Sequence, residues 1–221
     1  MRLALFDLDH TLLSGDSDVL WCDFLVDAGL LEPSWRGCCE RIAAAYTAGT
    51  ITPQDYCDFH ASTLAGRDPE SLRPLRERFL AERIRPRIPD DARALLERHR
   101  DEGHRLVLTT ATSRVVSELT AHELGFADDY IATELEMADG RFTGRALAPL
   151  NMRIGKVERL RQWLAAQREP ETVLPQAIFY TDSINDLPLL SVVRTPVVVD
   201  PDPRLESTAR RKGWRVLRFE R

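Results

Sequence analysis

A short apolar run close to the N-terminus, residues 3–6, leads directly into two aspartates, Asp7 and Asp9. Because side chains alternate along a strand, both carboxylates should emerge on the same side at its carboxyl end, where open α/β sheets place their ligands. Two carboxylates this close repel each other unless a cation, a shared proton or a division of roles relieves them. The pair therefore points to a hard cation such as Mg²⁺, to acid/base chemistry, or to both. A solvated pair in a loop is the alternative, and it is common for Asp-x-Asp alone.

A second acidic cluster lies near the other end of the chain. Residues 177–180 form another short apolar run, which is followed by Asp182 and, four residues later, by Asp186. Asn185 and Asp186 are suited to open a helix that continues to Leu190, and one turn of helix can bring the two aspartates to one site. A lone Asp at a helix start is usually only a cap. Two clusters that each follow a buried-looking strand are better explained by convergence on one metal ion.

Hydroxyl and basic residues lie between these clusters. Residues 105–113 predict a strand that passes into hydroxyl residues around Thr110, followed by a helix over about residues 114–124. Hydroxyls and free N–H groups at a helix start form a natural phosphate seat, although ordinary N-capping by Ser113 is an alternative. Lys156 stands at the start of an amphipathic helix over residues 157–164. Such a lysine is most often surface, but the aspartates need a cation, so Lys156 becomes a candidate partner for Asp7 and a phosphate.

This ordered set resembles the haloacid dehalogenase-like phosphohydrolases, and within them the branch with a helical cap that includes the phosphoserine phosphatases. The matching stretches are residues 7–11, Thr110 within Thr-Ala-Thr, Lys156, and residues 182–186. The resemblance spans almost the whole chain. One departure is mild, because Thr110 stands where serine is frequent and keeps the hydroxyl. The resemblance implies a Mg²⁺-dependent phosphatase.

The resemblance also implies a role for each motif residue. Asp7 would be the nucleophile that forms an aspartyl-phosphate, and Asp9 would act first as general acid and then as general base. Lys156 would hold Asp7 ionised and bind the phosphate, together with Thr110 and Ala111. Mg²⁺ would be held by the Asp7 carboxylate, the Asp9 backbone carbonyl and Asp182, with Asp186 ligating directly or supporting through water.

Alternation of strands and helices predicts an α/β fold with a Rossmann-like, doubly wound parallel sheet. Residues 16–85 differ, because they carry helical periodicity over residues 19–28, 35–48, 53–64 and 69–82. We expect them to form an all-helical cap domain inserted into a catalytic core of residues 1–15 and 86–221. The core should further contain a helix over residues 90–100, a hairpin over residues 135–143 around Asp139-Gly140, a fifth parallel strand at residues 197–199 and an edge strand at residues 215–217.

The resemblance also bears on the substrate. In phosphoserine phosphatases an acidic residue nine positions after the nucleophile binds the substrate amine, and Asp16 stands there. Those enzymes hold the substrate carboxylate with a cap arginine, but residues 42–66 contain no Arg or Lys, and His60 falls near the expected place. We therefore expect a small phosphorylated amino alcohol such as histidinol phosphate, as in a histidinol-phosphatase type of enzyme. Phosphoserine is the alternative if an arginine from elsewhere takes over, the candidates being Arg36, Arg41 and Arg67.

The composition of the chain limits the kinds of partner that we expect the protein to bind. The net charge of −5 argues against nucleic acid or an anionic membrane as partner. No apolar stretch approaches the roughly 20 residues of a membrane-spanning helix, and Met1 is followed almost at once by the first strand. We expect a cytoplasmic protein, a monomer or a homodimer, that binds a small phosphomonoester.

Other classes of function fit less well. A dinucleotide-binding domain needs a glycine-rich first turn, and the chain contains no Gly-x-Gly. A non-catalytic phosphoacceptor or binding protein remains an alternative of a different class, although receiver modules lack the cap and the second aspartate. Cys57 and His60 have a spacing that could begin a metal site, but reduced cysteines in a helix are commonplace.

Overall fold

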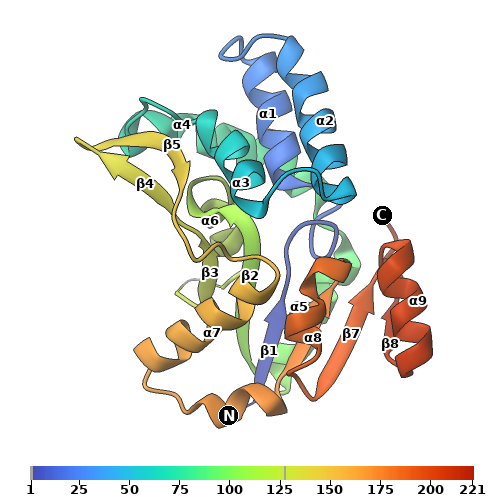
Figure 1. The fold of residues 1–221 in the computed structure, drawn as a ribbon. Coiled ribbons are helices and arrows are strands. Elements are labelled where there is room, and N and C mark those ends of the chain that lie inside the picture. Colours follow the sequence, from blue (N-terminus) through green and yellow to red (C-terminus); the bar gives the residue numbers. More distant parts are fainter. Residues whose placement is uncertain (1, 127) are drawn as a thin grey trace.

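The core of the protein is a six-stranded parallel sheet, shown in Figure 1. The computed structural model describes residues 2–126 and 128–221. Every pairing in this sheet is parallel, and the first strand lies near the middle, so the chain winds outward in both directions. The fold class predicted from the sequence is confirmed. In spatial order the strands are β3 (Tyr130–Thr133), β2 (Arg105–Ser113), β1 (Leu3–Phe6), β6 (Ile178–Thr181), β7 (Thr195–Val199) and β8 (Arg215–Leu217).

Helices cover both faces of the sheet. Alternation along β1 sends Ala4 and Phe6 into one hydrophobic cluster, which includes residues of α5 (Asp90–Asp101) and α6 (Arg114–Glu123). Leu3 and Leu5 point into a second cluster on the opposite face. That cluster includes residues of α7 (Ile154–Ala166), α8 (Leu187–Leu190) and α9 (Pro203–Lys212). The strands are therefore apolar on both faces, as buried parallel strands are.

Helices of the segment between β1 and α5 lie above the carboxyl ends of the strands (Figure 1). Their starts follow the local sequence, since Thr52 forms a capping box with Asp55 and the Asp68 side chain accepts from Ser71 N. The last helix is shorter than expected, because its α-helical part ends at Phe79 and continues as a π-helical turn. The elements are α1 (Ser17–Asp27), α2 (Ser34–Ala48), α3 (Pro53–Ser62), α4 (Pro69–Phe79), η1 (Leu80–Ile84) and η2 (Arg85–Arg87).

The predicted hairpin forms, but it packs against the helical segment. Its strands β4 (Leu135–Ala138) and β5 (Arg141–Ala146) are antiparallel. The N–H of Ala146 donates to the Asp58 carboxylate at 2.7 Å, and Gln54 Nε2 donates to the Ala146 carbonyl at 2.9 Å. Both contacts tie β5 to α3. The division into a core and a cap of residues 16–85 stays a prediction, and these contacts suggest that the hairpin accompanies the cap.

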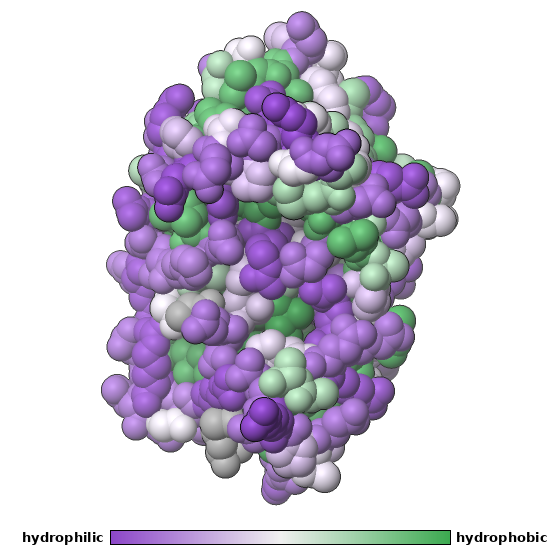
Figure 2. Space-filling model, turned by 90° about the vertical axis from the view of Figure 1, so that its left-hand side faces the viewer, coloured by the Kyte–Doolittle hydropathy of each residue, from purple (hydrophilic) through white to green (hydrophobic). Residues whose placement is uncertain are grey.

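One detail differs from the sequence-based expectation, and several elements were missed. Strand β2 ends at Ser113, as predicted, and Ser113 is the N-cap residue of α6, but its side chain makes no capping hydrogen bond. Strand β3, helix α9 and the 3₁₀ helix η3 (Glu171–Gln176) were not predicted. Within the described residues, no helix is both long and apolar enough to cross a bilayer. Figure 2 shows a mostly hydrophilic face with small, separate hydrophobic patches.

Candidate active site

The two acidic clusters meet at the carboxyl edge of the central strands. Asp7 directly follows β1, and its N–H donates to the Tyr180 carbonyl in β6 at 2.9 Å. Asp182 follows β6, and Asp186 lies one 3₁₀ turn further on. All three line one cavity of about 150 Å³ between the sheet and the helical segment. The neighbouring parallel strands thus bring together groups that are more than 170 residues apart in the sequence.

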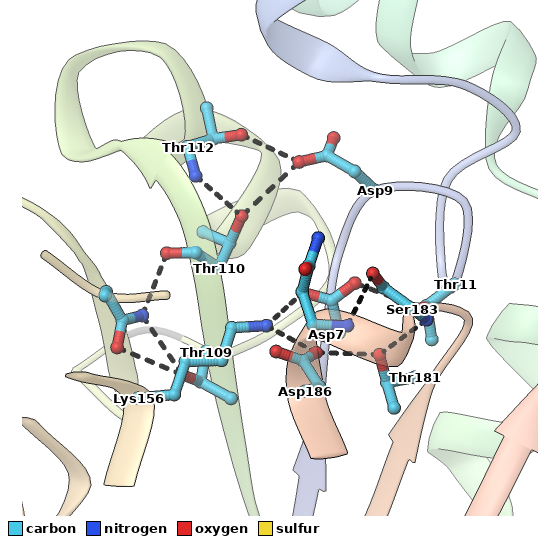
Figure 3. A network of polar contacts seen from close by, with 12 residues as sticks. Asp7, Asp9, Thr11, Thr109, Thr110, Thr112, Lys156, Thr181, Ser183 and Asp186 are labelled. Atoms are coloured by element: carbon cyan, nitrogen blue, oxygen red, sulfur yellow. Dashed lines mark hydrogen bonds and ion pairs between the residues drawn. The ribbon is translucent and has the colours of Figure 1, made fainter. Parts of the chain in front are cut away.

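Lys156 is the cation at the centre of this cluster (Figure 3). Its Nζ lies 2.7 Å from Asp7 Oδ1 and 2.7 Å from Asp186 Oδ2, and its side chain is 3% exposed. Burial alone would lower the pKa of Lys156, but the charges of Asp186 and Asp7 outweigh burial and raise it. The lysine is therefore charged at neutral pH. A sequence signal supports its special position, because only two of the 30 basic residues are lysines.

The approach of α7 to the site depends on a glycine. A Cβ at Gly155 would lie 2.0 Å from the Leu150 carbonyl oxygen, which is far inside van der Waals contact. Only a residue without a side chain allows the first turn of α7 to come this close to the preceding loop. Gly155 thereby positions Lys156, its neighbour in the chain.

One lysine does not neutralise the carboxylates around it. Burial raises the pKa of Asp7 to about 7, since the favourable charge of Lys156 only partly offsets it and Asp186 and Asp9 add repulsion. Burial, with the charges of Asp7 and Asp186, also raises the pKa of Asp182 well above its usual value. Oxygen donors with excess negative charge are the ligands that Mg²⁺ prefers. The residues present therefore fit a divalent cation.

Asp9 occupies a separate environment on the opposite side of the cavity. Its Oδ1 accepts the backbone N–H of Ser17 at 2.7 Å, and its Oδ2 accepts the Thr112 hydroxyl at 2.7 Å. Burial and the charge of Asp16 raise the pKa of Asp9, although the hydrogen bonds from Ser17 and Thr112 oppose this. A carboxyl whose pKa is raised in this way can carry a proton at neutral pH and release it, as a general acid must.

The comparisons with known proteins agree with this arrangement. The family model of the haloacid dehalogenase-like hydrolases matches residues 4–191. The chain belongs to this family. The sequence-based identification is thereby confirmed, and so is the enzyme class: the protein is a phosphatase.

Two of the relatives of this hydrolase illustrate the activities named in the family. A protein from Neisseria meningitidis serogroup C (strain 8013) named histidinol-phosphatase is 36% identical over 221 residues, which are 99% of each chain. A Mycobacterium tuberculosis protein named phosphoserine phosphatase SerB1 is 32% identical over 98% of this chain and 70% of its own. A solved structure of a protein with unknown function from Bordetella pertussis Tohama I matches with a TM-score of 0.91 at 37% identity, over 98% of this chain and 97% of that chain.

Hydroxyl side chains that the motif analysis did not single out hold the carboxylates of the hydrolase in place. The Thr11 hydroxyl donates to Asp7 Oδ2 at 3.2 Å, and Thr181 donates to Asp186 Oδ2 at 2.7 Å. Thr11 lies inside the first motif and could have been found by its spacing from Asp7. Thr181 gave no signal, because a threonine at the end of a strand is ordinary.

Thr110 and Ala111 have different positions. The Thr110 hydroxyl is fully buried, accepts the Thr112 N–H at 3.2 Å and lies 3.5 Å from Asp9 Oδ2. Thr110 is not among the residues that line the cavity, whereas Ala111 and Thr112 are. Asn151, which the sequence did not reveal, donates through Nδ2 to the Thr110 carbonyl at 2.8 Å. It therefore fixes the backbone of the strand end that faces the cavity.

The helical segment closes the other side of the cavity with acidic and aromatic groups. Asp16, Asp18, Tyr46 and Tyr56 line it. Asp16 Oδ1 accepts the N–H groups of Asp18 at 2.9 Å and Val19 at 3.1 Å, so Asp16 is also the N-cap of α1.

His60 is not brought into this cavity. It is buried and lines a small neighbouring cavity together with Cys57 and Asp18. Burial lowers the pKa of His60, so the ring is neutral. Cys57 and His60 also fail to gather a third metal ligand, since in the described part of the chain the group that converges tightly enough is His99, Glu102 and His104.

Proposed function

We propose that this hydrolase cleaves phosphomonoesters through an aspartyl-phosphate on Asp7. The observation that carries the proposal is the pairing of buried Asp7 with Lys156 at 2.7 Å, beside a separately held Asp9 of raised pKa. An Asp7 oxygen attacks phosphorus while the bond from phosphorus to the ester oxygen breaks, and Asp9 gives its proton to that leaving oxygen. Asp9 then takes a proton from the water that attacks phosphorus, and the bond between Asp7 and phosphorus breaks. The charge of Lys156 favours the ionised form of Asp7 and partly offsets its burial, and Lys156 faces the transferred group.

A magnesium ion fits the excess of negative charge described above. We propose that the Asp7 carboxylate, the Asp9 carbonyl and Asp182 would hold it, with Asp186 as a direct or water-mediated ligand. When bound, Mg²⁺ would offset charge on the transferred phosphoryl group. Lys156 and the donors around Asp9 are in place without the ion.

The lining of the cavity favours a substrate with a cationic group and no carboxylate. Of the described residues that line it, Lys156 is the sole Lys or Arg, and two carboxylates already hold it. The arginines considered from the sequence lie elsewhere, since Arg36 pairs with Asp23 and Asp27 and neither Arg41 nor Arg67 lines the cavity. Histidinol phosphate, the substrate type named for the Neisseria relative, carries an amine and an imidazole and fits this surface.

Phosphoserine is the second candidate. One observation favours it besides the named mycobacterial relative. The Arg153 guanidinium lies 4.8 Å from the ring centre of Tyr46, which lines the cavity. Arg153 thus places a positive charge beside one wall of the cavity, and a substrate carboxylate needs such a partner.

The test is a comparison of kcat/KM across phosphate monoesters, with p-nitrophenyl phosphate as a generic substrate. We expect histidinol phosphate to exceed phosphoserine by at least about tenfold, because a carboxylate without a partner is costly to bury. Asp7→Asn should abolish turnover of every substrate, and EDTA should inhibit. Activity of Asp7→Asn near that of the wild type would refute the covalent mechanism, and a preference for phosphoserine would refute the substrate assignment.

The remaining expectations stay predictions from the sequence. They are cytoplasmic residence, a monomer or a homodimer, and the absence of nucleic-acid and membrane partners.

A further inference from the structure

The proposed reaction leaves one buried acidic group of the cavity without a task. Asp18, the second residue of α1, is 8% exposed and lines both the main cavity and the small cavity behind it. Asp9 and Asp16 each accept at least two hydrogen bonds. The carboxylate of Asp18 has no hydrogen bond or ion pair with any residue that the structure describes. It is thus an unpaired acidic side chain that faces the cavity.

The surroundings of Asp18 make a protein partner for its charge unavailable. Its nearest charged neighbours are acidic, since Asp16 and Asp9, after burial itself, raise the pKa of Asp18 well above its usual value. His60, which shares the small cavity, has its pKa lowered by burial and supplies no positive charge. Lys156 is already held by two other carboxylates. Burying a carboxylate without a partner costs several kcal/mol, so its presence demands an explanation.

Aromatic rings stand beside this acidic group. Tyr46 and Tyr56 line the same cavity, with their ring centres 4.8 Å apart. Faces of aromatic rings attract organic cations, and a neighbouring carboxylate completes a site for a substituted ammonium or an imidazolium. Inorganic cations gain little from such a wall. Arg153 already lies 4.8 Å from the ring centre of Tyr46, so the match to a nitrogen cation carried by the substrate rests on the unpaired carboxylate together with Tyr56.

We propose that Asp18 is the specificity-determining residue of this phosphatase, and that it pairs with a cationic nitrogen of the substrate. The inference rests on the proposed function and deepens it, because it assigns the selection of a cationic substrate to a residue outside the four motifs. Asp16 is left mainly with the start of α1. The nitrogen can be an amine or an imidazole, and the experiment separates them.

The experiment compares Asp18→Asn with the wild type on four substrates. Histidinol phosphate carries both nitrogen groups, phosphoethanolamine carries only the amine, imidazolylethyl phosphate carries only the imidazole, and propyl phosphate carries neither. We expect the ratio of kcat/KM for histidinol phosphate to that for propyl phosphate to fall about 10- to 100-fold, which is the strength of a charge-assisted hydrogen bond. Of phosphoethanolamine and imidazolylethyl phosphate, the substrate whose kcat/KM falls to a similar extent in Asp18→Asn identifies the nitrogen group that Asp18 binds.

The matched control is Asp23→Asn on the same helix. Asp23 is 41% exposed, pairs with Arg36 and does not line the cavity, so the substrate ratio should stay at the wild-type value. Stability provides a second readout. Because Asp18→Asn removes a carboxyl whose ionised form is disfavoured by burial and by the charges of Asp16 and Asp9, its Tm should equal or exceed that of the wild type. A structural role for Asp18 would instead lower the Tm and leave the ratio unchanged, and that result would overturn the proposal.

A binding measurement tests the role of Asp18 independently of the proposed reaction. Histidinol phosphate can be titrated calorimetrically into Asp7→Asn, with and without the Asp18→Asn change, so that no turnover is needed. The second change should weaken binding about 10- to 100-fold, and Asp18→Ser should do the same if Asn perturbs the fold. Equal binding by the two proteins refutes the role of Asp18, even if the enzyme hydrolyses phosphate esters. If Asp18→Asn weakens binding as expected but the wild-type enzyme does not hydrolyse phosphate esters, only the proposed reaction is refuted.

Discussion

Replacement of Lys156 by Met tests the electrostatic centre of the site. The substitution keeps much of the side-chain volume but removes a charge that lies 2.7 Å from both Asp7 and Asp186. Two buried carboxylates are then left facing each other. Lys156→Arg should not restore function, because a side chain that is 3% exposed leaves no room for a planar guanidinium.

The expected magnitudes follow from burial and charge. Breaking a buried pair by removing one partner costs about 3–5 kcal/mol of unfolding free energy. The lower end applies near neutral pH, because the pKa of Asp7 is already about 7 and the carboxyl can take up a proton. For activity, each unit by which the pKa of Asp7 rises further costs about tenfold in ionised nucleophile. Loss of a positive group facing the phosphoryl oxygens adds about 10²–10³, so kcat/KM should fall by about 10³ or more.

The assay measures kcat/KM on p-nitrophenyl phosphate as a function of pH, together with denaturant unfolding. In the proposed mechanism Asp7 must be ionised to attack, so the acidic limb of the profile should move to higher pH in Lys156→Met. Lys212→Met is the matched control, because Lys212 is the other lysine of the chain and lies over Trp214, away from the cavity. A variant that keeps more than about a tenth of the activity, with an unshifted acidic limb, would refute the reasoning.

Two further predictions concern metal removal and α7. Burial raises the pKa of Asp7 from 3.8 to about 7 and raises that of Asp182, so the folded, metal-free protein holds protons that the unfolded chain releases. The unfolding free energy of the metal-free protein should therefore fall as the pH rises from about 4 to about 7. For the same reason Mg²⁺ should raise the Tm more at about pH 7.5 than at about pH 5. An unfolding free energy of the EDTA-treated protein that rises over this pH range would contradict the assignment. Gly155→Ala should lower the unfolding free energy by about 1–3 kcal/mol and reduce kcat, because the added Cβ would lie 2.0 Å from a backbone oxygen. Gly37→Ala in α2 is the control. Its Cβ would meet only the flexible end of Arg41, so the unfolding free energy should stay the same or rise.

The sequence by itself determined at which edge of the sheet the two acidic clusters meet. Apolar runs that end in Asp7, Thr110 and Asp182 could be recognised as strands, and parallel strands necessarily bring their carboxyl ends to one edge. The need of clustered carboxylates for a cation made Lys156 a candidate, and its match to the family motif supported that prediction. These inferences succeeded because each depends on local periodicity or on a rule of sheet topology, and neither requires knowledge of how distant side chains pack.

Tertiary structure decided the details on the other side of the cavity. Thr112 donates the short bond to Asp9, at 2.7 Å, while Thr110 lies 3.5 Å away. Which hydroxyl is nearer depends on the irregular stretch of β2 between Thr109 and Ser113, where its pairing register with β3 shifts. Asp16 caps a helix, Asp18 has no partner among the described residues, and His60 faces a different cavity. Tyr46 and Tyr56 carried no motif at all. Their places are set by how α1 to α3 pack over the sheet and against the hairpin, through contacts between residues that no local pattern connects.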